Sequence, residues 1–242
     1  MTQPTWIEPD WPAPPGIRAA STLRSGGVSR DRYASLNLGG HVGDDPERVA
    51  ENRRRLAAAL ELPSEPIWLS QVHGSRVARA DAPEVLAADA AHTRARGVVC
   101  AVMTADCLPV LLCSRDGETV AAVHAGWKGL AGGVVEAAVA AMGTRDVLAW
   151  LGPAIGPEAF EVGGEVRETF IRGGGEFAEG FREAGDGKWL ADIYRLARVV
   201  LNRLGVAEIR GGGWCTHGNP DDFFSYRRDR DTGRMATLIW RE

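Results

Sequence analysis

The chain has 242 residues, of which 45% are hydrophobic and 25% are charged, and its formal net charge is -4. This composition is typical of an ordinary soluble globular protein with a substantial core. The slight acidic excess gives no reason to expect a nucleic-acid partner. No apolar run approaches the roughly 20 residues that a membrane span needs, and the N-terminus does not read as a signal peptide. We therefore expect a cytoplasmic protein with no membrane partner.

The four cysteines are too few for a disulfide framework in a chain of this length. Cys100 and Cys113 lie inside apolar runs and are expected to behave as small buried hydrophobes. No pair has the Cys-x-x-Cys spacing, so the sequence does not predict a structural zinc knuckle.

The N-terminal part begins with a Pro-rich segment, residues 1–21, which we expect to run extended along the surface. Asp45 followed by Pro46 predicts a helix start, because an acid caps the first turn and proline is preorganised for it. Residues 66–72 predict a strand that leads to His73, with residues 76–80 as its hairpin partner. The Ala-rich residues 82–96 are ambiguous between helix and loop.

Three apolar runs in the middle of the chain, residues 98–103, 108–113 and 119–123, predict buried strands. Asp106 and Cys107 separate the first two runs, and His124 follows the third. Apolar residues then recur at intervals of three or four, which predicts a helix. A thiol and an imidazole at the ends of such strands can face one shared pocket.

The C-terminal part predicts a strand over residues 147–151, a helix over 163–171 and a Gly- and acid-rich surface insertion over 173–187. An amphipathic helix is predicted from Trp189 to Leu204, and further strands over 206–210 and 235–240. There is no internal repeat and no linker long enough to divide the chain. Residues 22–242 are therefore predicted to form one mixed α/β domain.

Two chemical interpretations share His73, Cys107 and His124. Two imidazoles and a thiolate from separate elements suit zinc with an open fourth position, with Asp106 as a base or an orienting group. Alternatively, Cys107 is a nucleophile that His124 activates, as in cysteine hydrolases. A purely structural role is the third reading, but polar groups inside apolar segments need a partner or a role.

The segment after residue 222 combines aromatic residues with Arg227 and Arg228. Guanidinium groups suit phosphate or carboxylate, and aromatic rings can stack on a flat ligand, although these arginines could equally pair with nearby acids. Cys215–His217 is a weak candidate for a second metal site. His41 and His92 lie in polar sequence and are expected to be solvated.

Six motifs occur in the same order as in one known family: SLNLG at 35–39, QVHG at 71–74, TADCLPVLL at 104–112, HAGWKG at 124–129, LGPAIGP at 151–157 and FFSYRRD…TGRMA at 223–236. The chain resembles the laccase-domain, or polyphenol-oxidase-like, family of bacterial proteins from about residue 22 onward. Members are described as purine nucleoside phosphorylases with adenosine deaminase activity, and one similar member as a peptidoglycan editing factor.

The resemblance implies a single-domain layered α/β sandwich with mixed sheets and a zinc site made of His73, Cys107 and His124. It implies phosphorolysis of adenosine, inosine, guanosine and S-methyl-5'-thioadenosine, together with deamination of adenosine. The signature of the nucleobase deaminases is absent, so deamination would use another scaffold, with Asp106 or a nearby acid moving protons.

The expected small-molecule partners are therefore a purine nucleoside and phosphate, and the oligomeric state stays open. Lys128, Arg227 and Arg228 are candidates for phosphate recognition, and Asn37 and Gln71 for further substrate contacts.

Besides a non-enzymatic module that binds a nucleotide or a partner, two alternative functions remain at this point. The same ligand set also suits one Cu²⁺, as in a polyphenol oxidase, but five histidines without a His-x-His pair cannot build a multicopper cluster. The other alternative is an amidase that uses Cys107 with His124, or zinc, to remove a misincorporated amino acid from a UDP-MurNAc cell-wall precursor.

Overall fold

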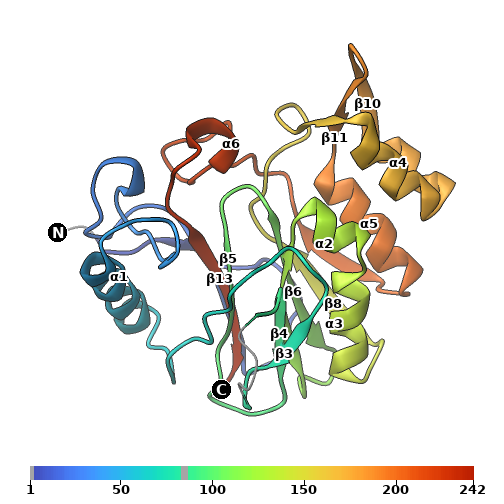
Figure 1. Cartoon of the computed structure of the whole chain (residues 1–242). Coiled ribbons are helices and arrows are strands. Elements are labelled where there is room, and N and C mark those ends of the chain that lie inside the picture. Colours follow the sequence, from blue (N-terminus) through green and yellow to red (C-terminus); the bar gives the residue numbers. More distant parts are fainter. Residues whose placement is uncertain (1–2, 83–86) are drawn as a thin grey trace.

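Two large sheets lie face to face between helical layers in the computed structural model, which describes residues 3–82 and 87–242 (Figure 1). The first sheet has six strands in the order β12-β8-β6-β7-β4-β3. The pairs β3/β4 and β8/β12 are parallel and the other pairs are antiparallel. These strands are β3 (Val77–Arg79), β4 (Ala90–Thr93), β6 (Leu108–Ser114), β7 (Val120–Ala125), β8 (Val147–Leu151) and β12 (Glu208–Gly211).

The second sheet is antiparallel and pairs the two ends of the chain. Its order is β1-β2-β13-β5, with β1 (Trp6–Ile7), β2 (Ile17–Thr22), β13 (Met235–Arg241) and β5 (Cys100–Thr104). A small antiparallel sheet of β9 (Glu161–Gly163), β11 (Lys188–Ala191) and β10 (Phe181–Gly185) stands at the periphery. The chain is thus a single-domain α/β protein with several sheets, as predicted.

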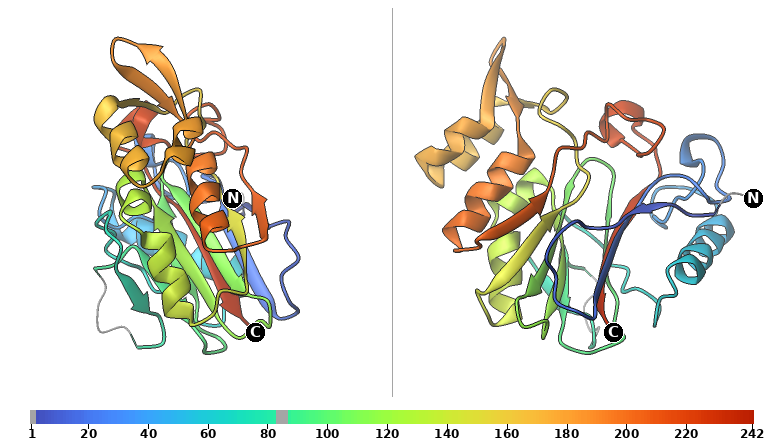
Figure 2. Two further views of the ribbon diagram at one scale, coloured as in Figure 1. Left: turned by 90° about the vertical axis from the view of Figure 1, so that its right-hand side faces the viewer. Right: turned by 180° about the vertical axis from the view of Figure 1, so that it is seen from behind.

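Helices cover the outer face of each large sheet, and they lie at opposite sides of the molecule both in Figure 1 and in the view from behind in Figure 2. The bounds are α1 (Pro46–Ala59), α2 (Trp127–Ala131), α3 (Val134–Met142), α4 (Gly164–Arg172), α5 (Ile193–Arg203) and α6 (Tyr226–Asp229), with 3-10 turns over 31–33 and 175–180. α1 packs on the four-stranded sheet, whereas α3 and α5 pack on the six-stranded one.

Strand β6 shows why the middle of the sequence is so uniformly apolar. Val110 and Leu112 face the core under α3 and α5, whereas Leu111 and Cys113 face the core between the two sheets. Successive strand side chains point to opposite faces, and here both faces are buried. Cys100 and Cys113 are fully buried, as predicted.

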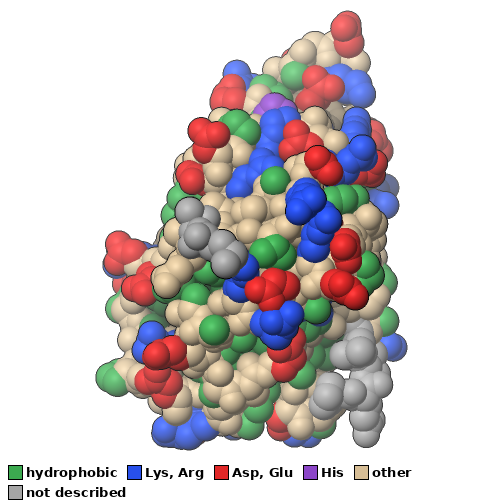
Figure 3. Space-filling view, turned by 90° about the vertical axis from the view of Figure 1, so that its left-hand side faces the viewer, with side chains coloured by type: hydrophobic (Ala, Val, Ile, Leu, Met, Phe, Trp, Pro, Cys, Tyr) green, Lys and Arg blue, Asp and Glu red, His purple; other side chains and the backbone are tan. Residues whose placement is uncertain are grey.

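The surface over α1 carries acidic and basic side chains interspersed with one another (Figure 3).

The predicted start of a helix at Asp45 and the four predicted strands in the middle of the chain are confirmed. Asp45 caps α1 by accepting a hydrogen bond from the backbone N–H of Glu47. The four predicted strands at 98–103, 108–113, 119–123 and 147–151 correspond to β5, β6, β7 and β8. The predicted helix after His124 is divided into α2 and α3 by glycines.

The predicted strand over residues 66–72 and its hairpin pairing are wrong, although the predicted partner does contain the strand β3. That segment forms only an isolated bridge between Ile67 and Cys100. Further along, the side-chain amide of Gln71 takes the place of a backbone partner, because it both donates to and accepts from the backbone of Met103 at 2.7 Å. β3 instead pairs in parallel with β4, in the segment that the sequence left ambiguous.

Two further expectations need correction. The helix predicted from Trp189 begins at Ile193, where Asp192 caps it, since residues 188–191 belong to β11. His92 lies in β4 and is half-buried rather than solvated. Within the described residues, no helix has the length and apolar character to cross a membrane.

Candidate metal centre

Strand pairing brings Cys107 and His124 together. Cys107 immediately precedes β6, and β6 pairs with β7 so that Pro109 lies opposite His124. His73 reaches the same place from the loop before β3. Its Nε2 lies 3.7 Å from the Sγ of Cys107, and the ligand atoms of the three residues all lie within 4.8 Å of one another.

Asp89 holds two of these three residues in place. Its fully buried carboxylate accepts a hydrogen bond from His124 Nδ1 at 2.8 Å, and also from the backbone N–H groups of His73 at 2.8 Å and Gly74 at 2.7 Å. The bond to Nδ1 leaves Nε2 of His124 free to face the thiol. One carboxylate therefore orients an imidazole on a strand and a loop that carries the other imidazole.

The backbone around the site adopts conformations that non-glycine residues rarely use. The φ angles of His73 and Asp106 are +60° and +97°. At Gly126 there is no room for a side chain, because a Cβ there would lie 2.9 Å from Cδ2 of His73 and 3.0 Å from Sγ of Cys107. Such conformations are typical of functional sites, where the surrounding structure holds them.

The thiol and imidazole stabilise each other's charged forms. Burial would raise the pKa of Cys107, but His124 and His73 lower it to about 6. Burial would likewise lower the pKa of His124, but Cys107 and Asp89 raise it to about 9. Cys107 is therefore a thiolate at neutral pH, which is the form that binds a metal or attacks a carbonyl.

The three residues fit a zinc ion. A tetrahedral zinc with Zn–N of about 2.1 Å and Zn–S of about 2.3 Å separates its ligand atoms by about 3.6 Å. The 3.7 Å between Cys107 Sγ and His73 Nε2 matches this spacing. Two imidazoles and a thiolate leave a fourth position open, as in catalytic zinc sites, although copper also accepts this donor set.

The triad lines a cavity of about 390 Å³. The apolar and aromatic part of its wall includes Trp127, Phe160 and Tyr226. The polar part includes three basic side chains, those of His41, Arg227 and Arg234, and the carboxylate of Asp106. The full lining is His41, Gln71, His73, Met103, Ala105, Asp106, Cys107, His124, Trp127, Ile155, Phe160, Ile193, Tyr226, Arg227 and Arg234.

Asp106 is fixed by two strong hydrogen bonds. Its Oδ1 accepts from the hydroxyl of Thr216, and its Oδ2 accepts from the backbone N–H of Arg227, both at 2.6 Å. These bonds connect the β5–β6 turn to the loop at Thr216 and to α6, which lies above the turn in Figure 1. The predicted residue Gln71 also lines the cavity, although Met103 occupies its amide.

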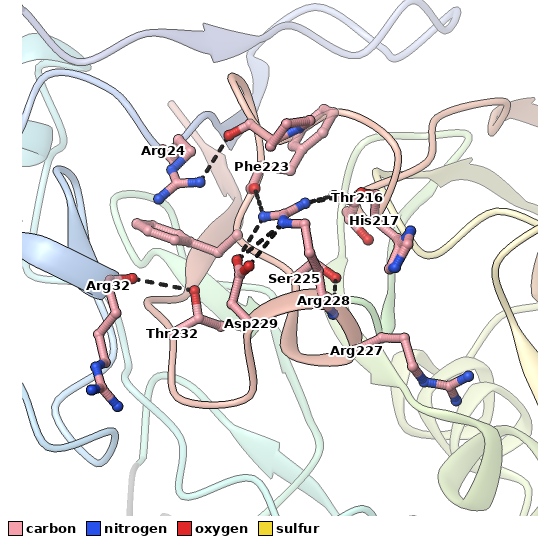
Figure 4. Close-up of polar contacts among 12 residues, drawn as sticks. Arg24, Arg32, Thr216, His217, Phe223, Ser225, Arg227, Arg228, Asp229 and Thr232 are labelled. Carbon is pink, nitrogen blue, oxygen red and sulfur yellow. Dashed lines mark hydrogen bonds and ion pairs between the residues drawn. The ribbon is translucent and has the colours of Figure 1, made fainter.

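Asn37, Lys128 and Arg228 do not line the cavity. Asn37 is fully buried, and Lys128 is exposed on α2 with its ammonium 5.7 Å from the Trp127 ring. The guanidinium of Arg228 donates to the carbonyls of residues 216, 217 and 223 and pairs with Asp229 (Figure 4). The side chain of Arg227 points away from this network (Figure 4).

Three site residues were not identified from the sequence: Asp89, His41 and Arg234. Asp89 interrupts an Ala-rich apolar run, a signal of the same kind as the one that identified Cys107. Arg234 lies in a motif but was not singled out, and His41 is exposed, as predicted, although it also lines the cavity. The residues Phe223 and Phe224, considered as a stacking surface, are instead buried. Among the described residues, Cys215 and His217 do not join a potential metal cluster.

The chain is similar to known proteins over nearly its whole length. A family model described as "Multi-copper polyphenol oxidoreductase laccase" matches residues 18–242. The chain belongs to this family. A purine nucleoside phosphorylase of Pseudomonas aeruginosa and the purine nucleoside phosphorylase YfiH of Escherichia coli are each 55% identical to it, over 97% of this chain and 98% of theirs.

Solved structures of this laccase-like family share the fold. A Neisseria meningitidis protein of the family DUF152 is 49% identical with a TM-score of 0.94, over 98% of this chain and 99% of that one. YlmD from Geobacillus stearothermophilus is 33% identical with a TM-score of 0.88, over 98% and 96%. The family description speaks of several coppers, yet the chain has only five histidines, and the described residues gather a single His–Cys–His cluster.

Proposed function

We propose that the protein is a zinc-dependent purine nucleoside phosphorylase that acts on adenosine, inosine, guanosine and S-methyl-5'-thioadenosine and also deaminates adenosine. The observation that carries this proposal is the cavity, in which His73, Cys107 and His124 share one space with two arginines and several aromatic side chains. The names of the relatives at 55% identity support the same activity.

In the proposed phosphorolysis, a phosphate oxygen bonds to C1′ of the ribose while the C1′–N9 bond breaks. The electron pair leaves on the purine, which takes up a proton, and the products are the free base and ribose 1-phosphate. His73, Cys107 and His124 would hold the zinc, which supplies a Lewis acid and lowers the pKa of bound water to about 7.

The chain's own residues supply the remaining requirements. Asp106 is the acidic residue in the lining, and its hydrogen bonds to Thr216 and Arg227 hold its carboxylate in one orientation for proton transfer. Trp127, Phe160 and Tyr226 provide flat apolar surface that suits a purine. The two arginines in the lining, Arg227 and Arg234, suit a phosphate oxyanion.

The test is chromatography of inosine and adenosine incubated with the protein, with and without phosphate. We expect phosphate-dependent hypoxanthine or adenine with ribose 1-phosphate, and inosine from adenosine. His73→Ala and Cys107→Ala should reduce these products to background. His217→Ala and Cys215→Ala are matched controls outside the cavity and should keep full activity. Undiminished turnover in both triad variants would contradict the assigned site.

A second function is favoured by the alignment of Cys107, His124 and Asp89. A thiolate, an imidazole and a carboxylate in this order also serve as nucleophile, base and orienting group in cysteine hydrolases. An amidase acting on a UDP-MurNAc precursor would lose activity when Cys107 is alkylated and keep it when zinc is removed by a chelator. A phosphorylase of the proposed kind should lose its activity under both treatments.

A further inference from the structure

Two arginines in the cavity lack an acidic partner. Among the described residues, neither Arg227 nor Arg234 has a carboxylate oxygen within ion-pair distance of its guanidinium, whereas many arginines elsewhere on the surface do. Asp106, the acidic residue in the lining, instead accepts from the backbone of Arg227. Cys107 and Asp106 favour the charged form of Arg234, but two guanidinium groups without a direct carboxylate partner still suit an anionic ligand.

The loop 37–39 holds Arg234 in position. Asn37 Oδ1 accepts from the backbone N–H of Arg234 at 2.9 Å, and the N–H of Leu38 donates to the Arg234 carbonyl at 3.1 Å. Gly39 leaves the space that the side chain crosses, because a Cβ there would lie 2.8 Å from Cγ of Arg234. Asn37 was predicted to contact the substrate, but it is buried and instead contacts Arg234, which lines the cavity.

The guanidinium of Arg234 is anchored on one side only. Its Nη1 donates to the carbonyls of Thr232 at 2.8 Å and Gly233 at 3.0 Å, and within the described part of the chain Nε and Nη2 have no hydrogen-bond acceptor. Arg227 is held similarly, since Nη1 donates to the carbonyl of Glu161 at 2.9 Å and its guanidinium lies 5.7 Å from the Phe160 ring. The protein thus holds both guanidinium groups in place, and each still has N–H donors available for a ligand.

His41 is the third basic residue of the lining. Burial lowers its pKa, and so do the charges of Arg234 and Arg53. A neutral imidazole still carries one N–H donor, so His41 adds a hydrogen bond without a third full charge. The charge of Arg234 thus acts on His41, and with Arg227 these residues give the lining three basic side chains that carry N–H donors.

We propose that Arg234, with Arg227 and His41, forms the subsite that binds a phosphate group. The role of this subsite in the reaction rests on the proposed phosphorolysis, in which the bound group is inorganic phosphate. The same chemistry could recognise the phosphate of a nucleotide, and competition between the two ligands distinguishes these sources. Oriented guanidinium forks suit the tetrahedral dianion better than a neutral sugar.

The test measures phosphate binding and phosphate kinetics in the full-length protein. Binding of inorganic phosphate is followed by calorimetry, and the KM values for phosphate and for inosine are determined separately. We expect Arg234→Gln to weaken phosphate binding and to raise the phosphate KM by about ten- to a hundred-fold, with the inosine KM changed less than about three-fold. Arg234→Lys should recover part of the loss.

The control is Arg54→Gln, which removes an equal charge from an arginine on α1 whose side chain is 73% exposed. Its phosphate KM should match that of the wild type. If Arg234→Gln does not fold, Arg227→Gln tests the same subsite from α6. Unchanged phosphate affinity in the folded Arg variants would overturn the inference, even where phosphorolysis is confirmed.

The two proposals fail in different ways. Wild-type protein that binds phosphate through Arg234 but forms no ribose 1-phosphate would contradict the phosphorylase proposal and keep the subsite. A nucleoside monophosphate that competes with inorganic phosphate in the wild type, and is itself consumed, would assign the subsite to the substrate's own phosphate.

Discussion

At the residue scale, the site depends on a carboxylate that is not itself a ligand candidate. Asp89 accepts hydrogen bonds from the His124 ring and from the backbone of residues 73 and 74. The sequence identified both histidines because each one interrupts or ends an apolar run. It did not identify Asp89, since only the β4–β7 pairing reveals which side chain lies beside His124.

Replacing Asp89 should therefore weaken metal binding without removing a ligand. In the wild type, backbone N–H groups donate to the Asp89 carboxylate. In Asp89→Asn, the amide NH₂ is itself a donor and cannot accept those hydrogen bonds. We expect zinc affinity to fall by about ten- to a hundred-fold, measured by competition with a chromophoric chelator. Asp186→Asn, in an exposed turn, is the control and should bind zinc as the wild type does. Equal affinity in both variants would show that Asp89 does not position the ligands.

The reactivity of Cys107 should depend on pH in an unusual range. In metal-free protein the histidines lower its pKa to about 6, so the thiolate persists at pH values well below those of an ordinary thiol with a pKa near 8.5. Alkylation of Cys107, resolved by peptide mass spectrometry, should be half-maximal near pH 6 and decline only below it. Zinc should protect the residue.

The buried Cys113 provides an internal comparison, because burial raises its pKa to about 12. It should stay unmodified across this pH range in folded protein. A Cys107 profile centred between pH 8 and 9 would contradict the proposed coupling with the histidines.

At the element scale, the strands buried on both faces were the easiest to predict. The apolar runs of β5, β6, β7 and β8 have the length of strands and are shorter than typical buried helices. The segments that support the site were harder, because their partners are side chains. Gln71 pairs with the backbone of Met103, and the loop at His73 is tied to Asp89, so neither forms the hairpin that the local pattern indicated.

The interface between the two large sheets should carry much of the stability. Leu111 in β6 is fully buried there, and Leu111→Ala should lower the free energy of unfolding by about 2–5 kcal/mol, measured by urea titration. Val72→Ala is the control, because Val72 is 60% exposed and its truncation should change stability by less than about 0.5 kcal/mol. Equal effects of the two substitutions would contradict this assignment of the core.

At the scale of the whole molecule, the fold class and the triad followed from sequence and resemblance, but the substrate contacts mostly did not. Arg228 was a reasonable candidate for phosphate, yet it secures the loops around residues 216 and 223, whereas Arg234 enters the cavity. The two arginines differ in the backbone carbonyls that surround them, which only the packing of the loop 37–39 and α6 determines.

The central claim is that His73, Cys107 and His124 form one metal centre that phosphorolysis requires. The most direct measurement is the rate of phosphate-dependent hypoxanthine release from inosine as zinc is returned to chelator-stripped protein. We predict a rate that rises until about one equivalent is bound and that stays at background in Cys107→Ala. Stripped protein that retains the full rate would contradict the account.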